Sequence, residues 1–111
     1  MTVEGEKMTW ESAQMHCRKS QTNLISLLSE TDHLLARRVF QKVNITERVW
    51  IGLRNLDQRW MWVNGDSLVY EAWSKGDQDY RCPIWKRCGA LTKDGLWENW
   101  DCQEKLNFIC Y

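Results

Sequence analysis

The chain has five cysteines, whose spacing indicates whether they bind a metal, form a redox motif or form disulfides. They are Cys17, Cys82, Cys88, Cys102 and Cys110. No two of them form the Cys-x-x-Cys motif of zinc ribbons and thioredoxin-like proteins, so a disulfide framework formed in an oxidising compartment is the favoured interpretation. Their odd number leaves one thiol outside any internal bridge. The residues alone leave the pairing open, because several connectivities can be drawn.

Nucleophilic catalysis is the second chemistry to consider, because one thiol is left over and the chain has two histidines. A Cys–His catalytic pair needs hydrogen-bond contact between the two side chains and a third group that orients the base. His16 and His33 both lie in the first third of the chain, and nothing in the sequence brings either near Cys82. Both are interpreted as exposed helix residues, and the chain is predicted not to be an enzyme.

Charge and hydropathy exclude two classes of partner. Fifteen basic and fifteen acidic residues cancel, which gives no electrostatic argument for nucleic acid or an anionic membrane. No apolar stretch approaches the roughly 18 residues of a membrane span, so direct membrane insertion by this segment is not expected.

Asn44-Ile45-Thr46 is an N-glycosylation sequon. With the cysteines, it predicts an extracellular protein, either secreted or the ectodomain of a membrane receptor.

Two amphipathic helices are predicted in the first half of the chain. Thr9 is the expected N-cap of the first, whose apolar residues fall at i, i+3 and i+7; they are Trp10, Ala13 and Cys17. Ser29, with Asp32 three residues later, resembles a capping box that opens the second helix. Its predicted apolar stripe is Leu35, Ala36, Val39 and Phe40. Residues 23–28, between the helices, form a short extended apolar run.

The second half of the chain is predicted to form short strands. The expected strands are residues 49–53, 60–63, 89–91, 96–97 and 106–111. Asn64-Gly65 and Lys93-Asp94-Gly95 are tight-turn signals. Residues 71–87 form a long loop, and loops of this length in a compact domain are usually functional or disordered. Two helices followed by short strands and one long loop predict a single α+β domain over residues 1–111.

Several short motifs follow one another over residues 8–111, and their order and spacing match those of a known family. They are Met8-Thr9-Trp10-Glu11-Ser12-Ala13-Gln14 leading to Cys17, then Trp50-Ile51-Gly52-Leu53, Trp60-Met61-Trp62 before Asn64-Gly65, Cys88-Gly89-Ala90-Leu91, Trp97, Cys102, and Phe108-Ile109-Cys110. Together they resemble the C-type lectin-like domain. The resemblance implies two helices packed on short antiparallel sheets with a long irregular loop. It also implies two internal disulfides, Cys17–Cys110 and Cys88–Cys102, which would leave Cys82 as a free or capped thiol or as the bridge of a covalent dimer.

The same resemblance implies where calcium would bind. Sugar-binding members hold calcium with carboxylate and carbonyl oxygens, which suit a hard cation, and the sugar hydroxyls bind the ion directly. The matching positions in this chain are Asp77, Asp79, Glu98 and Asn99, which all carry oxygen. Two matches fail. Gln78 stands where the family has a cis-proline, and Lys86 stands where it has a glutamate, so the four oxygens are either solvated loop residues or a weakened calcium site.

Two functions remain open on this basis. The favoured prediction is a recognition module that binds a protein or other ligand through the long loop, with no cofactor expected and with Trp85 and Lys86 at the contact surface. Tyr80 and Trp100 are further plausible contacts, since aromatic residues are enriched at binding hot spots. The alternative is a calcium-dependent carbohydrate-binding lectin that uses the four oxygen donors. The remaining tryptophans are expected in the core: Trp50, Trp60, Trp62, Trp73 and Trp97.

Overall fold

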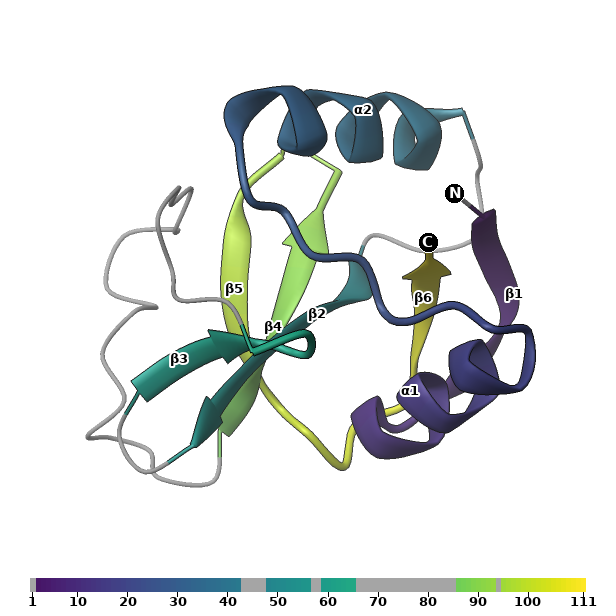
Figure 1. The fold of residues 1–111 in the computed structure, drawn as a ribbon, viewed down its shortest axis with the longest axis vertical. Coiled ribbons are helices and arrows are strands. Elements are labelled where there is room, and N and C mark those ends of the chain that lie inside the picture. The colour runs from purple at the N-terminus through teal and green to yellow at the C-terminus, as the bar shows by residue number, and fades with distance from the viewer. Residues whose placement is uncertain (1, 43–47, 57–58, 66–85, 94) are drawn as a thin grey trace.

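The structure is a computed structural model that describes residues 2–42, 48–56, 59–65, 86–93 and 95–111. Within these ranges the chain forms two helices and six strands (Figure 1). In chain order they are β1 (Thr2–Met8), α1 (Trp10–Lys19), α2 (Glu30–Gln41), β2 (Arg48–Leu56), β3 (Arg59–Trp62), β4 (Lys86–Thr92), β5 (Trp97–Asp101) and β6 (Leu106–Cys110). The predicted α+β class is confirmed. Neither of the described helices is long and apolar enough to cross a membrane.

One sheet carries the six strands, in the order β1-β6-β2-β4-β5, with β3 paired to β2 beside that path. Four strand pairs are antiparallel, which agrees with the antiparallel sheets that the resemblance implies, and a parallel pair between β2 and β6 joins them into one mixed sheet. Strand β1 was not predicted from the sequence. It pairs with the last strand, with Thr2 opposite Cys110, so the two ends of the described chain lie side by side (Figure 1).

Two hydrophobic clusters lie on the two sides of the central strand β2. Side chains alternate along a strand, so Val49, Ile51 and Leu53 pack with Phe40 of α2. Trp50 packs on the other side with the residues of α1. Because both faces of β2 are buried, residues 49–53 form an unbroken apolar run rather than an alternating one. The strand that the sequence motif predicted is therefore the centre of the core.

Both predicted helix starts are confirmed. Thr9 Oγ1 accepts a hydrogen bond from the Ser12 N–H (3.4 Å), and Ser29 Oγ accepts one from the Asp32 N–H (3.3 Å). Asp32 Oδ2 in turn accepts from the Leu28 N–H (3.2 Å). In the second helix the carboxylate of Asp32 thus bonds to the residue before the N-cap, and each helix has one backbone N–H of its first turn capped by a side chain.

The predicted apolar stripe of α2 is wrong in one position, and so is the prediction that both histidines are exposed. The buried residues of α2 are His33, Ala36 and Phe40, which follow i, i+3 and i+7. His33 is 5% exposed, whereas Leu35 is 46% exposed. A helix can present only one stripe to the sheet, and the stripe that faces it contains His33, whose side chain accepts a hydrogen bond from Trp97.

The predicted disulfides are confirmed. Cys17–Cys110 joins α1 to β6, and Cys88–Cys102 joins β4 to the chain that follows β5. The predicted long loop ends two residues earlier than expected, because Lys86 and the residue after it already belong to β4. Residues 71–85 of that loop lie outside the described residues.

Most tryptophans predicted to be internal are internal. Trp50, Trp62 and Trp97 are buried, and Trp60 is partly buried against the core. Trp73 lies outside the described residues. The two predicted turns contain Gly65 (φ 89°) and Gly95 (φ 85°), so both glycines adopt the left-handed conformation that such turns require.

Candidate functional site

The residues predicted to bind ligand fall into two groups. Glu98 and Asn99 are neighbours on β5, and Lys86 is the first residue of β4, where its backbone lies opposite Asp101. The others lie outside the described residues: Asp77, Asp79, Trp85, the leftover Cys82 and the sequon residue Asn44. The described part of the predicted site is thus strand β5 with the side chains around it.

The carboxylate of Glu98 is held by two donors. Arg48 Nε donates to Glu98 Oε1 (2.5 Å), and Trp100 Nε1 donates to the same oxygen (2.8 Å). The guanidinium carbon of Arg48 also lies 4.8 Å from the centre of the Trp100 ring, which is a cation–π arrangement. The charged side chains of Arg48 and Glu98 are 32% and 21% exposed. The negative charge of Glu98 is therefore paired with the guanidinium of Arg48 in the same chain.

Asn99 points to the other side of β5. It lies opposite Gly89 and is 7% exposed, and consecutive residues of a strand point to opposite faces. The side chains of Glu98 and Asn99 are therefore directed to opposite faces of β5. Calcium needs six to eight oxygens gathered around it, and the other two residues of the predicted calcium set, Asp77 and Asp79, lie outside the described residues. Over the described ranges there is also no cluster of three His, Cys, Asp or Glu side chains able to hold a metal.

A buried aromatic pair positions the start of β5. Trp97 Nε1 donates to His33 Nδ1 (3.2 Å), and the Trp97 ring meets that of Trp62 edge-on, with the ring centres 5.3 Å apart. Burial lowers the pKa of His33 below its usual value, because desolvation disfavours the imidazolium. In the neutral tautomer that carries its proton on Nε2, Nδ1 can accept the bond from Trp97. His33 thus acts as an acceptor that orients Trp97, next to Glu98.

The histidines offer no catalytic pair among the described residues. His33 contacts Trp97, and His16 lies 3.9 Å from a carboxylate oxygen of Glu4 and packs edge-on against Phe108. All four described cysteines are in disulfides. A thiol activated by a histidine, which catalysis by a cysteine nucleophile would need, is not found in this part of the chain.

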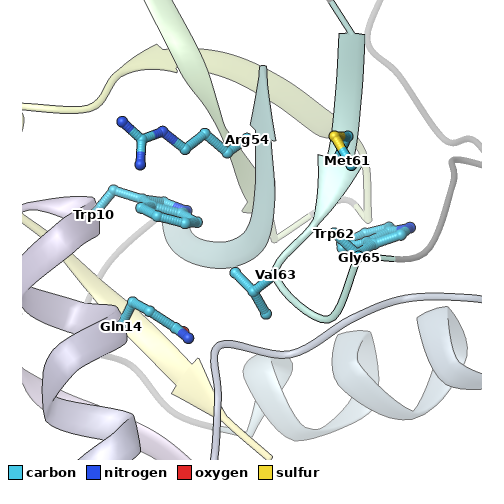
Figure 2. A pocket seen from close by; sticks show the side chains of 7 residues that line it. All are labelled: Trp10, Gln14, Arg54, Met61, Trp62, Val63 and Gly65. Carbon is cyan, nitrogen blue, oxygen red and sulfur yellow. The ribbon is translucent and has the colours of Figure 1, made fainter. Parts of the chain in front are cut away.

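A pocket of about 320 Å³ opens between α1 and the hairpin formed by β2 and β3 (Figure 2). Figure 2 shows the α1 residues on one side, Arg54 extending over Trp10, and the residues of β3 and its turn on the other side. The side chains that form the walls are Trp10, Gln14, Arg54, Met61, Trp62 and Val63. No pattern in the sequence predicted this pocket.

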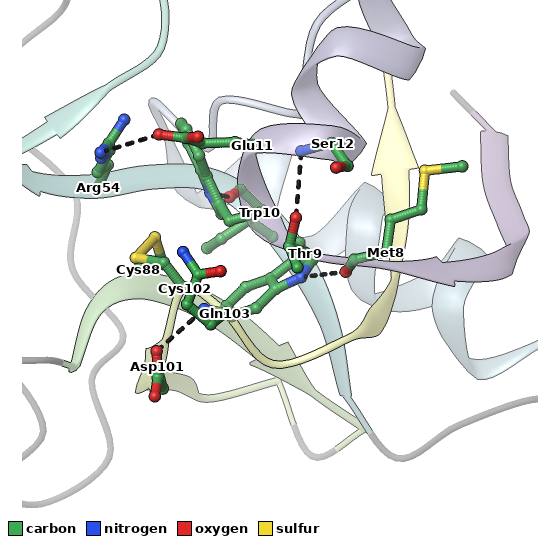
Figure 3. Close-up of a disulfide and its surroundings, with 12 residues drawn as sticks. Met8, Thr9, Trp10, Glu11, Ser12, Arg54, Cys88, Asp101, Cys102 and Gln103 are labelled. Carbon is green, nitrogen blue, oxygen red and sulfur yellow. Dashed lines mark hydrogen bonds and ion pairs between the residues drawn. A yellow bond between two sulfur atoms is a disulfide. The ribbon is translucent and has the colours of Figure 1, made fainter.

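The start of α1 is tied to the sheet beside the Cys88–Cys102 bridge (Figure 3). The backbone N–H of Trp10 donates to the Cys102 carbonyl (3.0 Å). The indole Nε1 of Trp10 donates to the Ile51 carbonyl of β2 (2.9 Å). These bonds fix the helix wall of the pocket relative to both β2 and the disulfide.

Comparisons with known proteins agree on one family. The family described as Lectin C-type domain matches residues 6–111. The C-type lectin lectoxin-Lio1 of Erythrolamprus poecilogyrus is 34% identical, over 97% of this chain and 70% of its own length. A subunit of snaclec VP12 from Daboia palaestinae is 32% identical, over 94% of this chain and 80% of its own. The carbohydrate-recognition domain of the mouse scavenger receptor C-type lectin has a TM-score of 0.82 at 27% identity, over 97% of this chain and 83% of its own.

Proposed function

The chain belongs to the C-type lectin domain family, and on that premise we propose that it is an extracellular recognition module that binds a protein or another non-sugar ligand. The contacts are assigned to the segment before β4, including Trp85 and Lys86. Binding proceeds without a complete calcium site. The proposal describes a binding module rather than an enzyme.

The observation that supports calcium-independent binding is the ion pair between Glu98 and the guanidinium of Arg48. The carboxylate that would coordinate calcium already accepts hydrogen bonds from Arg48 and Trp100. A metal bound to this carboxylate would lie beside the Arg48 guanidinium, whose positive charge repels a divalent cation. Lys86 adds a second cationic residue at a position where sugar-binding members have a carboxylate. Both features lower the expected affinity for a divalent ion.

Calcium should therefore leave the melting temperature of this domain unchanged. Extracellular calcium modules bind with dissociation constants of about 10⁻⁴–10⁻³ M. At roughly 10 mM calcium such a site would stabilise the fold by about 1.4–2.7 kcal/mol, which raises the melting temperature of a domain of this size by several degrees. Thermal melts in calcium, in magnesium at equal ionic strength and in chelator measure the effect directly. We expect the three curves to coincide.

Asn99→Ala is the matched variant for this measurement. If calcium, but not magnesium, raises the melting temperature of the wild type and the rise disappears in Asn99→Ala, calcium-independent binding is wrong. The four-residue set of Asp77, Asp79, Glu98 and Asn99 would then be the calcium site.

A calcium-dependent carbohydrate-binding lectin is the second candidate function. Similarity to the carbohydrate-recognition domain of the mouse scavenger receptor C-type lectin favours it. In that case Asp77 and Asp79 complete the site from the segment before β4, after Glu98 has left Arg48. Glycan arrays in calcium and in chelator separate the two candidates, because only the lectin loses its signal when calcium is removed.

The extracellular location and a covalent dimer are further parts of the proposal. The two disulfides are typical of an oxidising compartment, and glycosylation is proposed at Asn44.

Cys82 is the cysteine outside the two bridges, and we assign it to a bridge between two chains. One relative is named as a subunit of a larger protein, snaclec VP12. Electrophoresis without reductant should show a dimer for the wild type and a monomer for Cys82→Ser; a monomer for both would leave Cys82 as a free or capped thiol.

A further inference from the structure

We propose that the pocket between α1 and the β2–β3 hairpin is a second ligand site, which takes a small molecule with an apolar body and one carboxylate group. None of the pocket residues belongs to the predicted calcium set, so this site is independent of the function proposed above. Its volume of about 320 Å³ is at the lower end of the range for small-molecule sites.

The apolar body of the ligand is inferred from the pocket walls. The more accessible apolar side chains are those of Met61 and Val63, a thioether and a branched aliphatic group, and behind them lie the indoles of Trp10 and Trp62, which are 5% and 2% exposed. Aromatic side chains bury large apolar areas, and methionine adapts to irregular shapes. Such walls favour a compact ring or a branched hydrocarbon over a polar sugar.

The walls are held in place by hydrogen bonds to the rest of the fold. Trp10 is bonded through its indole N–H to β2, and the Val63 N–H donates to the Gly52 carbonyl (2.8 Å). Both ends of the Gln14 amide are engaged, since Nε2 donates to Asn23 Oδ1 (2.9 Å) and Oε1 accepts from the Leu24 N–H (2.8 Å). Binding therefore requires little reorganisation of the walls, which preserves the affinity that a small ligand can reach.

The carboxylate of the ligand is inferred from Arg54. It is the charged residue among those that line the pocket, and its guanidinium carbon lies 5.3 Å from the centre of the Trp10 ring. Its ion-pair partner, Glu11 (3.4 Å), has a side chain that is 65% exposed, and exposed pairs of this kind are weak. A ligand carboxylate at the pocket mouth can therefore compete with Glu11 and form the two parallel hydrogen bonds that a guanidinium offers.

A charge series of one scaffold tests the proposal. The probes are 4-phenylbutyrate, its neutral amide and 4-phenylbutylamine, titrated into the folded domain while the ¹H–¹⁵N signals are followed, including the Trp10 indole N–H. We expect the carboxylate to bind most tightly and the amine most weakly. Shifts should be confined to the pocket residues, with Trp10 and Val63 among them.

Three variants make the test specific. Arg54→Gln should weaken binding of 4-phenylbutyrate roughly fivefold to tenfold, which corresponds to the loss of one partly exposed charge-assisted bond, and bring its affinity close to that of the amide. Glu11→Gln should strengthen it by removing the competing carboxylate. Arg38→Gln, an exposed arginine on α2, is the control and should leave it unchanged. Thermal melts verify that each variant is folded.

The proposal is wrong if the three probes bind with equal affinity, if none binds, or if the shifted signals lie away from the pocket. It is also wrong if Arg38→Gln weakens binding as much as Arg54→Gln. That last outcome would mean that the probe senses overall charge and not this site.

Discussion

Replacing Gly52 with alanine should lower the free energy of unfolding by about 3 kcal/mol, since overpacking a well-packed core costs about 1–3 kcal/mol and occasionally more. A methyl group at this position would lie 2.6 Å from the Leu24 carbonyl oxygen and 3.0 Å from that of Ile25. Both contacts are with backbone, so no side-chain rotation relieves them. Gly52 is the glycine of the motif at the centre of β2.

The backbone around Gly52 cannot move away easily, because it is bonded on both sides. The Gly52 N–H donates to the Ile25 carbonyl (2.7 Å), and the Ile25 N–H donates to the Ile109 carbonyl of β6 (3.1 Å). The backbone of Leu24 also pairs with that of Cys110 in an isolated antiparallel β-bridge. A shift of residues 24–25 would therefore disturb the sheet as well, and strain rather than relaxation is expected.

The matched control is Gly5→Ala in β1, where a methyl group would meet nothing within 4 Å. We expect this variant to stay within about 0.5 kcal/mol of the wild type, as surface substitutions usually do. Urea unfolding followed by circular dichroism measures both changes. Equal stability of the two variants would show that residues 24–25 yield, and that the close approach at Gly52 is not needed by the fold.

Removing the Cys17–Cys110 disulfide, by replacing both cysteines with alanine, should cost about 4 kcal/mol. The bridge spans 93 residues. In the chain-entropy model, a loop of this length restricts the unfolded chain by about 4–5 kcal/mol, although measured values are often lower. A domain of this size has a total stability of roughly 5–15 kcal/mol, so the loss is a large share of it. Cys17 and Cys110 are buried, and alanine avoids placing a hydroxyl there.

The Cys88–Cys102 bridge provides the comparison within the same chain. It spans 14 residues, and the same model gives about 3 kcal/mol for such a loop. Both double variants should be made with Cys82→Ser, so that the remaining thiol cannot exchange into a new bridge. Urea midpoints and slopes then give the two losses. A larger loss for the short bridge would mean that native packing around it, and not the restriction of the unfolded chain, governs its contribution.

The predicted calcium residues show that a motif match gives the residue types at a site but not the partners of their side chains. The sequence aligns Glu98 and Asn99 with two calcium ligands of the family, and both retain oxygen. The structure shows that the Glu98 carboxylate is bonded to Arg48, which lies 50 residues earlier. No pattern around Arg48 distinguishes it from any other basic residue at the start of a strand. Only the pairing of β2 and β5 with β4 brings the two charges together.

His33 illustrates the same limit on the helical side. Its polarity indicates exposure, and the apolar residues around it allow a different stripe. Its acceptor nitrogen is nevertheless bonded to Trp97, 64 residues later. A buried polar group is tolerated when it has such a partner, and the partner cannot be recognised from the residues near His33. The burial of His33 could have been suspected from its spacing, because His33, Ala36 and Phe40 fall on one helix face just as the residues of the predicted stripe do.

The sequence by itself determined the features that depend on neighbouring residues. These are the helix caps at Thr9 and Ser29, the buried run of β2, the glycine turns and, through the motif order, the family and its disulfides. The tertiary structure alone decided the pairing of β1 with β6, the cation beside Glu98, the burial of His33 and the pocket beside Trp10. The physical reason is range. Caps, periodicity and turns are properties of a few consecutive residues, whereas each of the others joins segments whose distance in space depends on the register of the whole sheet.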